Sequence, residues 1–306
     1  MPRKTALLIV NPHCRHGNAD MSEARASLRE TGWDVIFQSP QDPGRIPELV
    51  RRHGGEADVI ILGGGDGTMN TAIEALLEVR KPLGVLPLGT ANDLARTLGL
   101  PQDPLDAIHS LANGVSYAVD LGWVNGKHYF NVASLGISAH MTNKLDPAVK
   151  RRWGILGYPV KALEALREAR PFTAEVTCDD MHLRLKAVQI AVGNGCYYGG
   201  GMRVSEDAGI DDASLDLYAI RPRSLWGYFT LALALRSGRQ GHSSGVHMLR
   251  GQAITITTRH PQPVNTDGEL TTTTPARFRV VPAALPVLVA PDYAARRRKE
   301  VTDVTR

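Results

Sequence analysis

The chain has 306 residues, of which 43% are hydrophobic and 22% are charged, values ordinary for a globular protein with room for two domains. Its net charge of +4 and pI of about 9.0 suit an anionic membrane surface, nucleic acid or a phosphorylated ligand, and exclude none of them. Three widely spaced cysteines argue against a disulfide framework, and the apolar runs at 6–10 and 225–235 are too short for a signal peptide core and a membrane span. We therefore expect a cytoplasmic protein whose membrane contact, at the inner face, would be peripheral.

The first part of the chain alternates strands with helices. Strands are expected at 5–10, 33–37, 58–62 and 83–86, and helices at 18–31, 46–53, 68–77, 90–98 and 103–113. This alternation predicts an α/β domain with a doubly wound parallel sheet and right-handed crossovers. Ligands of such sheets bind beyond the carboxyl ends of the strands.

The third strand ends in a glycine-rich turn. Its sequence is Gly63-Gly64-Gly65-Asp66-Gly67-Thr68-Met69-Asn70, with Thr68 as a candidate helix cap. Glycines allow positive φ angles and a close approach of ligand to main chain, and the N–H groups of a helix start favour a phosphate. An ordinary strand-to-helix turn is the alternative. The glycine spacing fits neither a Walker A loop nor a Rossmann fingerprint.

Two further turns are expected at the same edge of the sheet. The first begins at Asn11-Pro12, and in it Arg15 is either a phosphate ligand or a solvated loop residue. The second is Pro87-Leu88-Gly89-Thr90-Ala91-Asn92-Asp93, in which Thr90 is a candidate N-cap. From the residues alone, Thr90 and Asp93 could form a capping pair and nothing more.

From about residue 124 short strands dominate, which predicts a β-rich sandwich as the second domain. The expected strands are 127–132, 172–177, 183–192, 215–220, 253–258, 277–281 and 286–290. Helical patterns at 148–170 and 225–236 interrupt them, and 294–306 is expected to be a frayed tail. The basic interval 144–170 could dock on anionic lipid headgroups, but a solvated amphipathic helix is the favoured interpretation.

Three turns of the second domain stand out. The segment 193–202 is dense in glycine, which is typical of tight turns. Gly209-Ile210-Asp211-Asp212-Ala213-Ser214 is either a plain turn or a site for a hard cation, bound through carboxylate and carbonyl oxygens. Asp267-Gly268-Glu269 is typical of a hairpin followed by an exposed glutamate.

These motifs, in this order, resemble those of the diacylglycerol-kinase-like lipid kinases, and the resemblance covers nearly the whole chain. It implies ATP as phosphoryl donor, with Mg²⁺. It also implies a nucleotide site made of the following residues: Asn11, Pro12, Ser39, Gly64, Gly65, Asp66, Gly67, Thr68, Asn70 and Thr90.

The resemblance further implies catalytic and metal-binding residues. Glu269 would be the general base that accepts the proton of a lipid hydroxyl, and Asp66 would orient the phosphates or their Mg²⁺. A second Mg²⁺ would be held by the Asp212 carboxylate and the carbonyls of Gly209 and Ser214. The chain departs from the family at three positions: Cys14 replaces a serine, and Arg15 and Ala213 each replace a glycine.

The resemblance implies a nucleotide domain at 1–123, to which 284–306 return, and a lipid-substrate domain at 124–283. The γ-phosphoryl group would pass to diacylglycerol or a related lipid alcohol taken from the membrane surface, and an open strand edge would permit a homodimer. An NAD kinase and a nucleotide or lipid sensor without turnover remain alternatives. No nucleic-acid partner is expected, because the sequence has no basic stripe or recognised module.

Overall fold

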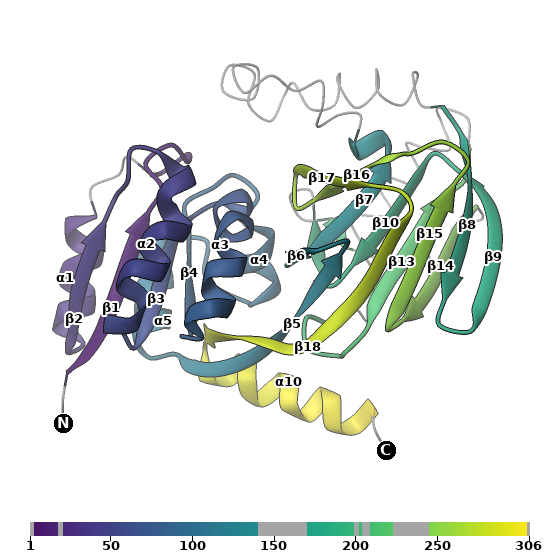
Figure 1. The fold of residues 1–306 in the computed structure, drawn as a ribbon. Helices are drawn as coiled ribbons and strands as arrows, with labels where there is room; N and C mark the ends of the chain where they lie inside the picture. Colours follow the sequence, from purple (N-terminus) through teal and green to yellow (C-terminus); the bar gives the residue numbers. More distant parts are fainter. Residues whose placement is uncertain are drawn as a thin grey trace.

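The computed structural model describes residues 3–17, 21–139, 170–198, 202–203, 209–222 and 245–304 (Figure 1). In the first half, four parallel strands lie in the order β2-β1-β3-β4. Every residue of β3 and β4 is buried, as the apolar runs predict for strands covered on both faces. Their bounds are β1 (Lys4–Val10), β2 (Trp33–Gln38), β3 (Val59–Gly64) and β4 (Leu83–Pro87).

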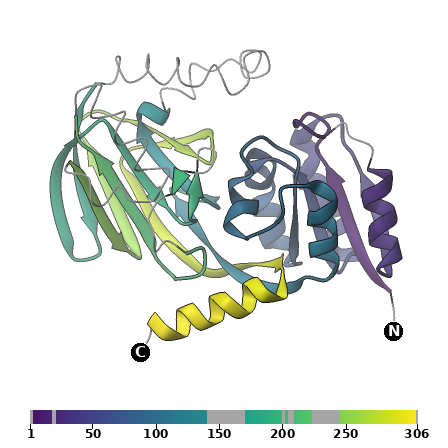
Figure 2. The same cartoon turned by 180° about the vertical axis from the view of Figure 1, so that it is seen from behind.

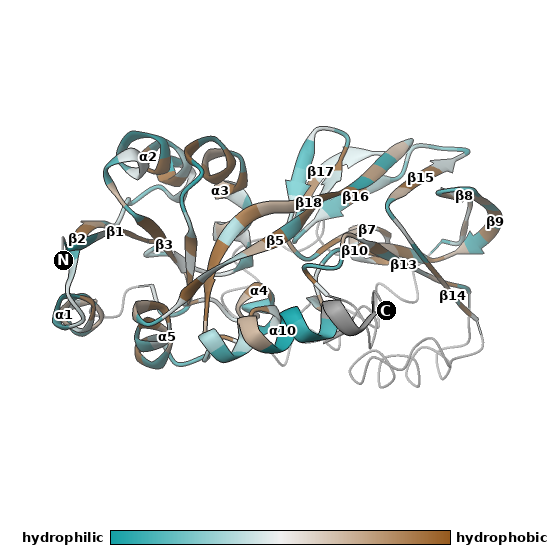
Figure 3. Cartoon of the chain, turned by 90° about the horizontal axis from the view of Figure 1, so that it is seen from below, coloured by the Kyte–Doolittle hydropathy of each residue, from teal (hydrophilic) through white to brown (hydrophobic). Residues whose placement is uncertain are grey.

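Helices cover both faces of this parallel sheet, with α2 and α3 on one side and α1 and α5 on the other (Figure 3). The predicted start at Asp103 is confirmed, since its carboxylate accepts the N–H groups of Leu105 and Asp106. The bounds are α1 (Ser22–Glu30), α2 (Ile46–His53), α3 (Asp66–Val79), α4 (Asp93–Thr97), α5 (Pro104–Ala112), η1 (Pro43–Arg45) and η2 (Gly54–Glu56). The predicted doubly wound α/β architecture is confirmed.

The second half is a β-sandwich, as predicted. One layer has the order β14-β13-β10-β7-β16-β17, and the other contains β18, β15, β8 and β9. A separate core, which includes Tyr129, Leu217 and Ile254, fills the space between them. The strands are β7 (Val132–Gly136), β8 (Phe172–Cys178), β9 (Met181–Ala187), β10 (Gln189–Gly193), β13 (Leu215–Ile220), β14 (Val246–Gly251), β15 (Ala253–Thr258), β16 (Pro263–Thr266) and β17 (Glu269–Thr273).

Two long antiparallel strands, β5 (Val115–Val124) and β18 (Ala276–Val289), join the halves. The beginning of β18 pairs with β15 of the sandwich, whereas Val287 pairs with Leu83 of β4. Between these parts the register shifts, and Ala283 adopts a left-handed φ of 47°. The domain limits at 123 and 284 remain a prediction.

Several predicted strands differ from the observed ones. The interval 127–132 covers β6 (Lys127–Tyr129) and only the first residue of β7, and 183–192 covers the end of β9 and most of β10. The second break falls at Val188, whose N–H donates to Ile220 instead of continuing β9, so the chain changes layers there. Conversely, 277–281 and 286–290 belong to one strand, β18, because β5 pairs with both. Strands β5 and β14 were not predicted.

The expected frayed tail is wrong. Residues Pro291–Val304 form helix α10, which runs beneath the junction of the two halves (Figure 2). Although α10 is mostly hydrophilic, its Tyr293 is buried and donates a hydrogen bond from its hydroxyl to the Thr97 carbonyl at 3.0 Å. Tyr293 also packs edge-on against Tyr117. These contacts fix an element whose composition predicts disorder.

The predicted helices at 148–170 and 225–236, the basic interval 144–170 and the glycines at 199–201 lie outside the described residues, apart from Arg170. Beside them, β11 (Tyr197–Tyr198) and β12 (Met202–Arg203) form a two-stranded ladder. Among the helices that are described, none combines the length and the apolar character needed to cross a bilayer.

Candidate active site

Three turns meet at the carboxyl edge of the parallel sheet. The N–H of Asn11 donates to the Gly63 carbonyl at 2.8 Å, and the N–H of Leu88 donates to the Gly64 carbonyl at 3.0 Å. The N–H of His16 then reaches the Leu88 carbonyl at 3.0 Å. Main-chain hydrogen bonds therefore join the turn after β1 to the turn after β4, with the glycine turn between them.

The glycines of these turns allow backbone to pack on backbone. A Cβ on Gly89 would lie 2.5 Å from the Gly65 Cα, and a Cβ on Gly64 would lie 2.4 Å from the Thr68 Oγ1. A Cβ on Gly67, by contrast, would have no atom within 4 Å. The side of the turn at Gly67 is therefore open to a ligand, whereas the other glycines are enclosed by the protein.

Asn11 holds the first turn to the glycine turn through its side chain. Its Nδ2 donates to the Thr68 Oγ1 at 2.9 Å, and its Oδ1 accepts the N–H of His13 at 2.9 Å. Thr68 is not the helix cap that the sequence predicted. Helix α3 begins at Asp66, after the extended Gly65, and Thr68 lies in its first turn.

Asp66 links the glycine turn to the third turn. Its Oδ1 accepts the N–H of Leu94 at 3.0 Å, and so caps α4. Thr90, the predicted cap, is exposed and precedes the helix by three residues. The N-cap position belongs instead to Asn92, which has a φ of 51° and accepts the Gly89 N–H through its Oδ1.

The remaining predicted nucleotide residues surround this edge. Pro12 is half-buried beside Asn11, and Ser39 is exposed directly after β2. Asn70, one turn into α3, has a buried Oδ1 with no hydrogen-bond partner in the described part of the chain. An acceptor left in that state suits a donor from a ligand or its water shell.

The Asp267-Gly268 turn confirms the predicted hairpin between β16 and β17. Both residues have positive φ, 46° and 96°, as a two-residue hairpin turn requires. The Asp267 carboxylate accepts three consecutive backbone N–H groups, from Phe130 at 2.8 Å, Asn131 at 3.1 Å and Val132 at 3.0 Å. Glu269 follows on the exposed side of the hairpin.

This hairpin region contacts the α/β half through strand β6. Burial raises the pKa of Asp267 to about 7, against the lowering effect of its N–H donors, and the charge of Asp66 adds to the rise. The adjacent strand β6 also contacts α3, where His128 Nδ1 lies 3.0 Å from the Glu74 Oε1. The contact of His128 with Glu74 therefore joins the strand beside the hairpin to helix α3 of the α/β half.

The predicted metal turn has another arrangement. The Asp212 Oδ2 accepts the Gly209 N–H at 2.8 Å and contacts the Arg250 Nη2 at 2.8 Å, while its Oδ1 accepts the Ser214 N–H at 3.1 Å. Burial raises the pKa of Asp212 to about 6, although the Arg250 charge opposes this. Within the described residues, no three His, Cys, Asp or Glu side chains converge as a metal site. The metal site made of Gly209, Asp212 and Ser214 remains a prediction. The Arg250 guanidinium beside the Asp212 carboxylate does not favour it.

The partners of this turn could not be identified from the sequence. Asp120, Arg250 and Arg297 lie 93, 38 and 86 residues from the residues they contact, and no local pattern marks them.

Comparison with known proteins agrees with this geometry. Residues 5–124 match the diacylglycerol kinase catalytic domain, and residues 131–289 match the YegS C-terminal NAD kinase beta sandwich-like domain. The chain is 31% identical over 291 residues to a "Probable lipid kinase YegS-like" of Chromohalobacter salexigens, covering 90% of each chain. It is 30% identical over 226 residues to a diacylglycerol kinase of Bacillus subtilis, covering 73% of this chain and 75% of that protein. A crystal structure of a diacylglycerol kinase from Bacillus anthracis is similar with a TM-score of 0.80 and 25% identity, covering 95% and 99% of the two chains.

Proposed function

Because the chain belongs to the family of diacylglycerol-kinase-like lipid kinases, we propose that it transfers the γ-phosphoryl group of ATP to a lipid hydroxyl. The proposed acceptor is diacylglycerol or a related lipid alcohol, in line with the name of the B. subtilis relative. Peripheral contact with the membrane and a homodimer are parts of the same proposal.

The nucleotide would bind over the open side of the glycine turn. The first N–H groups of α3 have no partner within the helix, and the helix dipole favours a negative charge there. Gly67 leaves room for phosphate oxygens. The Asn70 Oδ1, which has no hydrogen-bond partner among the described residues, would accept from a water of the nucleotide's hydration shell. Exposed Thr90 and Ser39, with Asn11 and Pro12, would line the rest of the nucleotide site.

Asp66 suits a role beside the phosphates. One carboxylate oxygen caps α4, which fixes the side chain, and the other would coordinate the Mg²⁺ that accompanies ATP. When bound with ATP, Mg²⁺ would neutralise charge on the transferred group. Asp66 would thus orient the nucleotide and would itself take no proton.

Glu269 would accept the proton of the attacking hydroxyl. Its exposed position on the hairpin leaves the carboxylate accessible to a substrate. A general base must come within hydrogen-bond reach of the proton, so we expect the two halves to close during turnover. The observation that carries the proposal is a chain of contacts: Asp267, two residues before Glu269, binds the N–H of Phe130 directly after β6, and His128 of β6 contacts Glu74 of α3, the helix that the glycine turn begins.

The decisive experiment incubates the protein with radiolabelled ATP and Mg²⁺, and with either a total lipid extract or NAD. Wild type is compared with Glu269→Ala and with Glu175→Ala, a matched exposed glutamate on β8 outside the site. We expect labelled lipid with wild type and Glu175→Ala, and none with Glu269→Ala. If Glu269→Ala labels lipid as strongly as wild type does, Glu269 is not the general base.

The same experiment separates the alternatives. Label on NAD would assign the protein to NAD kinase chemistry. ATP binding without labelled product would support a sensor, which the altered residues Cys14 and Ala213 keep in consideration.

A further inference from the structure

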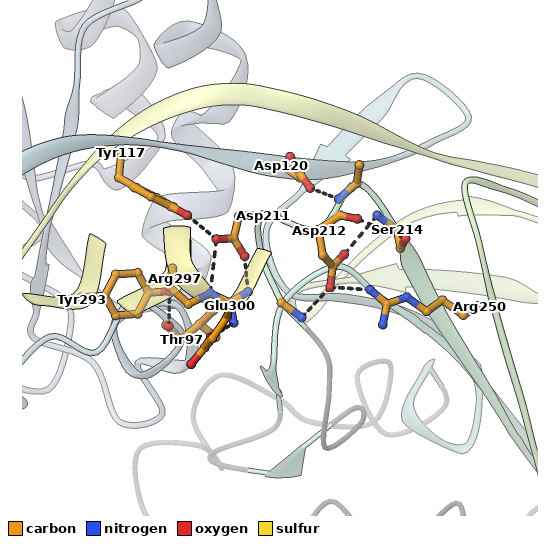
Figure 4. A network of polar contacts seen from close by, with 12 residues as sticks. Thr97, Tyr117, Asp120, Asp211, Asp212, Ser214, Arg250, Tyr293, Arg297 and Glu300 are labelled. Atoms are coloured by element: carbon orange, nitrogen blue, oxygen red, sulfur yellow. Dashed lines mark hydrogen bonds and ion pairs between the residues drawn. The ribbon is translucent and has the colours of Figure 1, made fainter. Parts of the chain in front are cut away.

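The turn at 209–214 lies between α10, β5 and β14, and its two adjacent carboxylates are bound by two arginines from different elements (Figure 4). Asp211 accepts from the Arg297 Nε at 3.2 Å, forms an ion pair with the Arg297 Nη2, and accepts the Tyr117 hydroxyl at 2.5 Å. Arg297 comes from α10, and Tyr117 from β5. The Asp211 side chain is only 5% exposed, so this ion pair is well shielded from water.

Asp212 has the second guanidinium. Arg250 of β14 lies 2.8 Å from the Asp212 Oδ2, and the Asp212 side chain is 15% exposed. Arg250 is also the register partner of Asp216 across the β13–β14 ladder, so both side chains share one face of the sheet. One guanidinium is therefore held near two carboxylates.

Backbone donors complete the surroundings of the turn. The Asp212 oxygens also accept the N–H groups of Gly209 and Ser214. Ala213 has a φ of 54°, and its N–H donates to the buried Asp120 carboxylate at 2.7 Å. This bond stabilises a left-handed conformation that alanine adopts at a cost.

Gly209 explains how Arg297 fits beside this turn. A Cβ at this position would lie 2.1 Å from the Arg297 Nη2, so any side chain larger than hydrogen would displace the guanidinium. The glycine here makes room for a cation that the protein itself supplies.

We propose that Arg250 supplies the positive charge at Asp212 that a divalent cation would otherwise provide, so that this turn is stabilised without metal. A second cation on the Asp212 carboxylate would meet the charge of Arg250 at close range, and like charges repel. The inference concerns the fold and does not depend on the identity of the phosphoryl acceptor. In an active enzyme, Mg²⁺ would be required with ATP alone.

Thermal unfolding of the nucleotide-free protein tests this directly. We expect the Tm of wild type to differ by less than about 1 °C between EDTA and 5 mM Mg²⁺, since a ligand that does not bind the native state does not stabilise it. A saturable rise of about 3 °C or more that disappears in Asp212→Asn would show a metal at the turn and would overturn the proposal. A rise that persists in Asp212→Asn comes from elsewhere and supports it.

A variant then tests whether Arg250 and a cation compete for one position. In EDTA, Arg250→Gln should lower the Tm by about 2–5 °C, because it leaves the carboxylate of Asp212 without its counter-charge. Mg²⁺ should restore part of this loss in Arg250→Gln but none in the double variant Arg250→Gln/Asp212→Asn. Bound Mn²⁺, counted by paramagnetic resonance, should rise from zero to one per chain in Arg250→Gln.

Arg51→Gln is the matched control, because Arg51 also pairs with a carboxylate, that of exposed Glu78 at 2.6 Å. Its Tm should not respond to Mg²⁺. If Mg²⁺ raises the Tm of Arg250→Gln no more than that of Arg51→Gln, a divalent cation does not take the place of the Arg250 guanidinium, and the proposal fails. If Arg250→Gln does not fold, the comparison of wild type with Asp212→Asn decides alone.

Discussion

The turns of the α/β half and those of the sandwich are held in place by different groups. Around the glycine turn the backbone packs on itself, and a Cβ on Gly89 would lie 2.5 Å from the Gly65 Cα. In the sandwich, carboxylates gather backbone N–H groups from distant strands. Asp267 binds three such groups, and Asp120 binds those of Ala213 and Ala283 at 2.7 Å each.

This difference predicts which motif residues are free to act. Backbone packing leaves one side of the glycine turn open for a ligand, as the empty surroundings of a Cβ at Gly67 indicate. Carboxylate turns use their acids to hold the fold, so Asp267 is engaged by three N–H groups, whereas Glu269 is exposed on the same hairpin. Asp66 belongs to both groups, because it lies in the glycine turn and one of its carboxylate oxygens also caps α4.

Asp66 should show the largest effect. Asp66→Asn keeps an oxygen for the Leu94 N–H but removes the charge, so we expect unchanged stability and at least about a hundredfold loss of turnover. Asp66→Ala should lose the same turnover and about 1 kcal/mol of stability, because α4 loses its cap. Urea unfolding and the labelling assay measure the two effects separately. An active Asp66→Asn would show that the negative charge of Asp66 is not needed for turnover.

Asp267 should give the largest loss of stability. Asp267→Ala leaves three N–H groups without an acceptor and should lower the free energy of unfolding by about 3 kcal/mol, measured in urea. The control is Asp179, which has a similar φ of 48° in the β8–β9 hairpin but is exposed and binds two N–H groups. Asp179→Ala should cost about 1 kcal/mol, because water replaces the lost acceptor. Equal losses would show that burial does not distinguish the two turns.

The same residue predicts a dependence on pH. The folded pKa of Asp267, about 7, exceeds its unfolded value of 3.8, so the folded state binds more protons between these values. Its contribution to stability is therefore complete below about pH 4 and is lost as the pH rises to about 7. The cost of Asp267→Ala should accordingly be greater at pH 5 than at pH 8. If the cost of Asp267→Ala instead grows with pH, the pKa of Asp267 is lower in the folded state than in the unfolded state.

The contrast also explains what could be predicted from the sequence. Glycine turns, the Asp103 cap and the Asp-Gly hairpin depend on neighbouring residues, and their positions were predicted correctly. The carboxylate contacts join residues far apart, such as Asp120 and Ala283, which are 163 positions apart. Nothing in a local window specifies such a pair. Helix α10 was missed for the same reason, because its order depends on Thr97 and Asp211.

The smallest change in stability should come from Gly67, and comparison with Gly89 tests whether the open and closed sides of the turn are distinct. Gly89→Ala forces the Gly65 backbone to move and should cost about 1–3 kcal/mol, as overpacking does elsewhere. Gly67→Ala meets no atom within 4 Å and has no positive φ, so its free energy of unfolding should match wild type or exceed it by about 0.5 kcal/mol. Its methyl group would nonetheless occupy the space proposed for phosphate oxygens, and ATP titrated by calorimetry should bind more weakly. Undiminished ATP binding by a stable Gly67→Ala would move the phosphates away from this face of the turn, because a ligand in contact with the main chain there has no room for the added carbon.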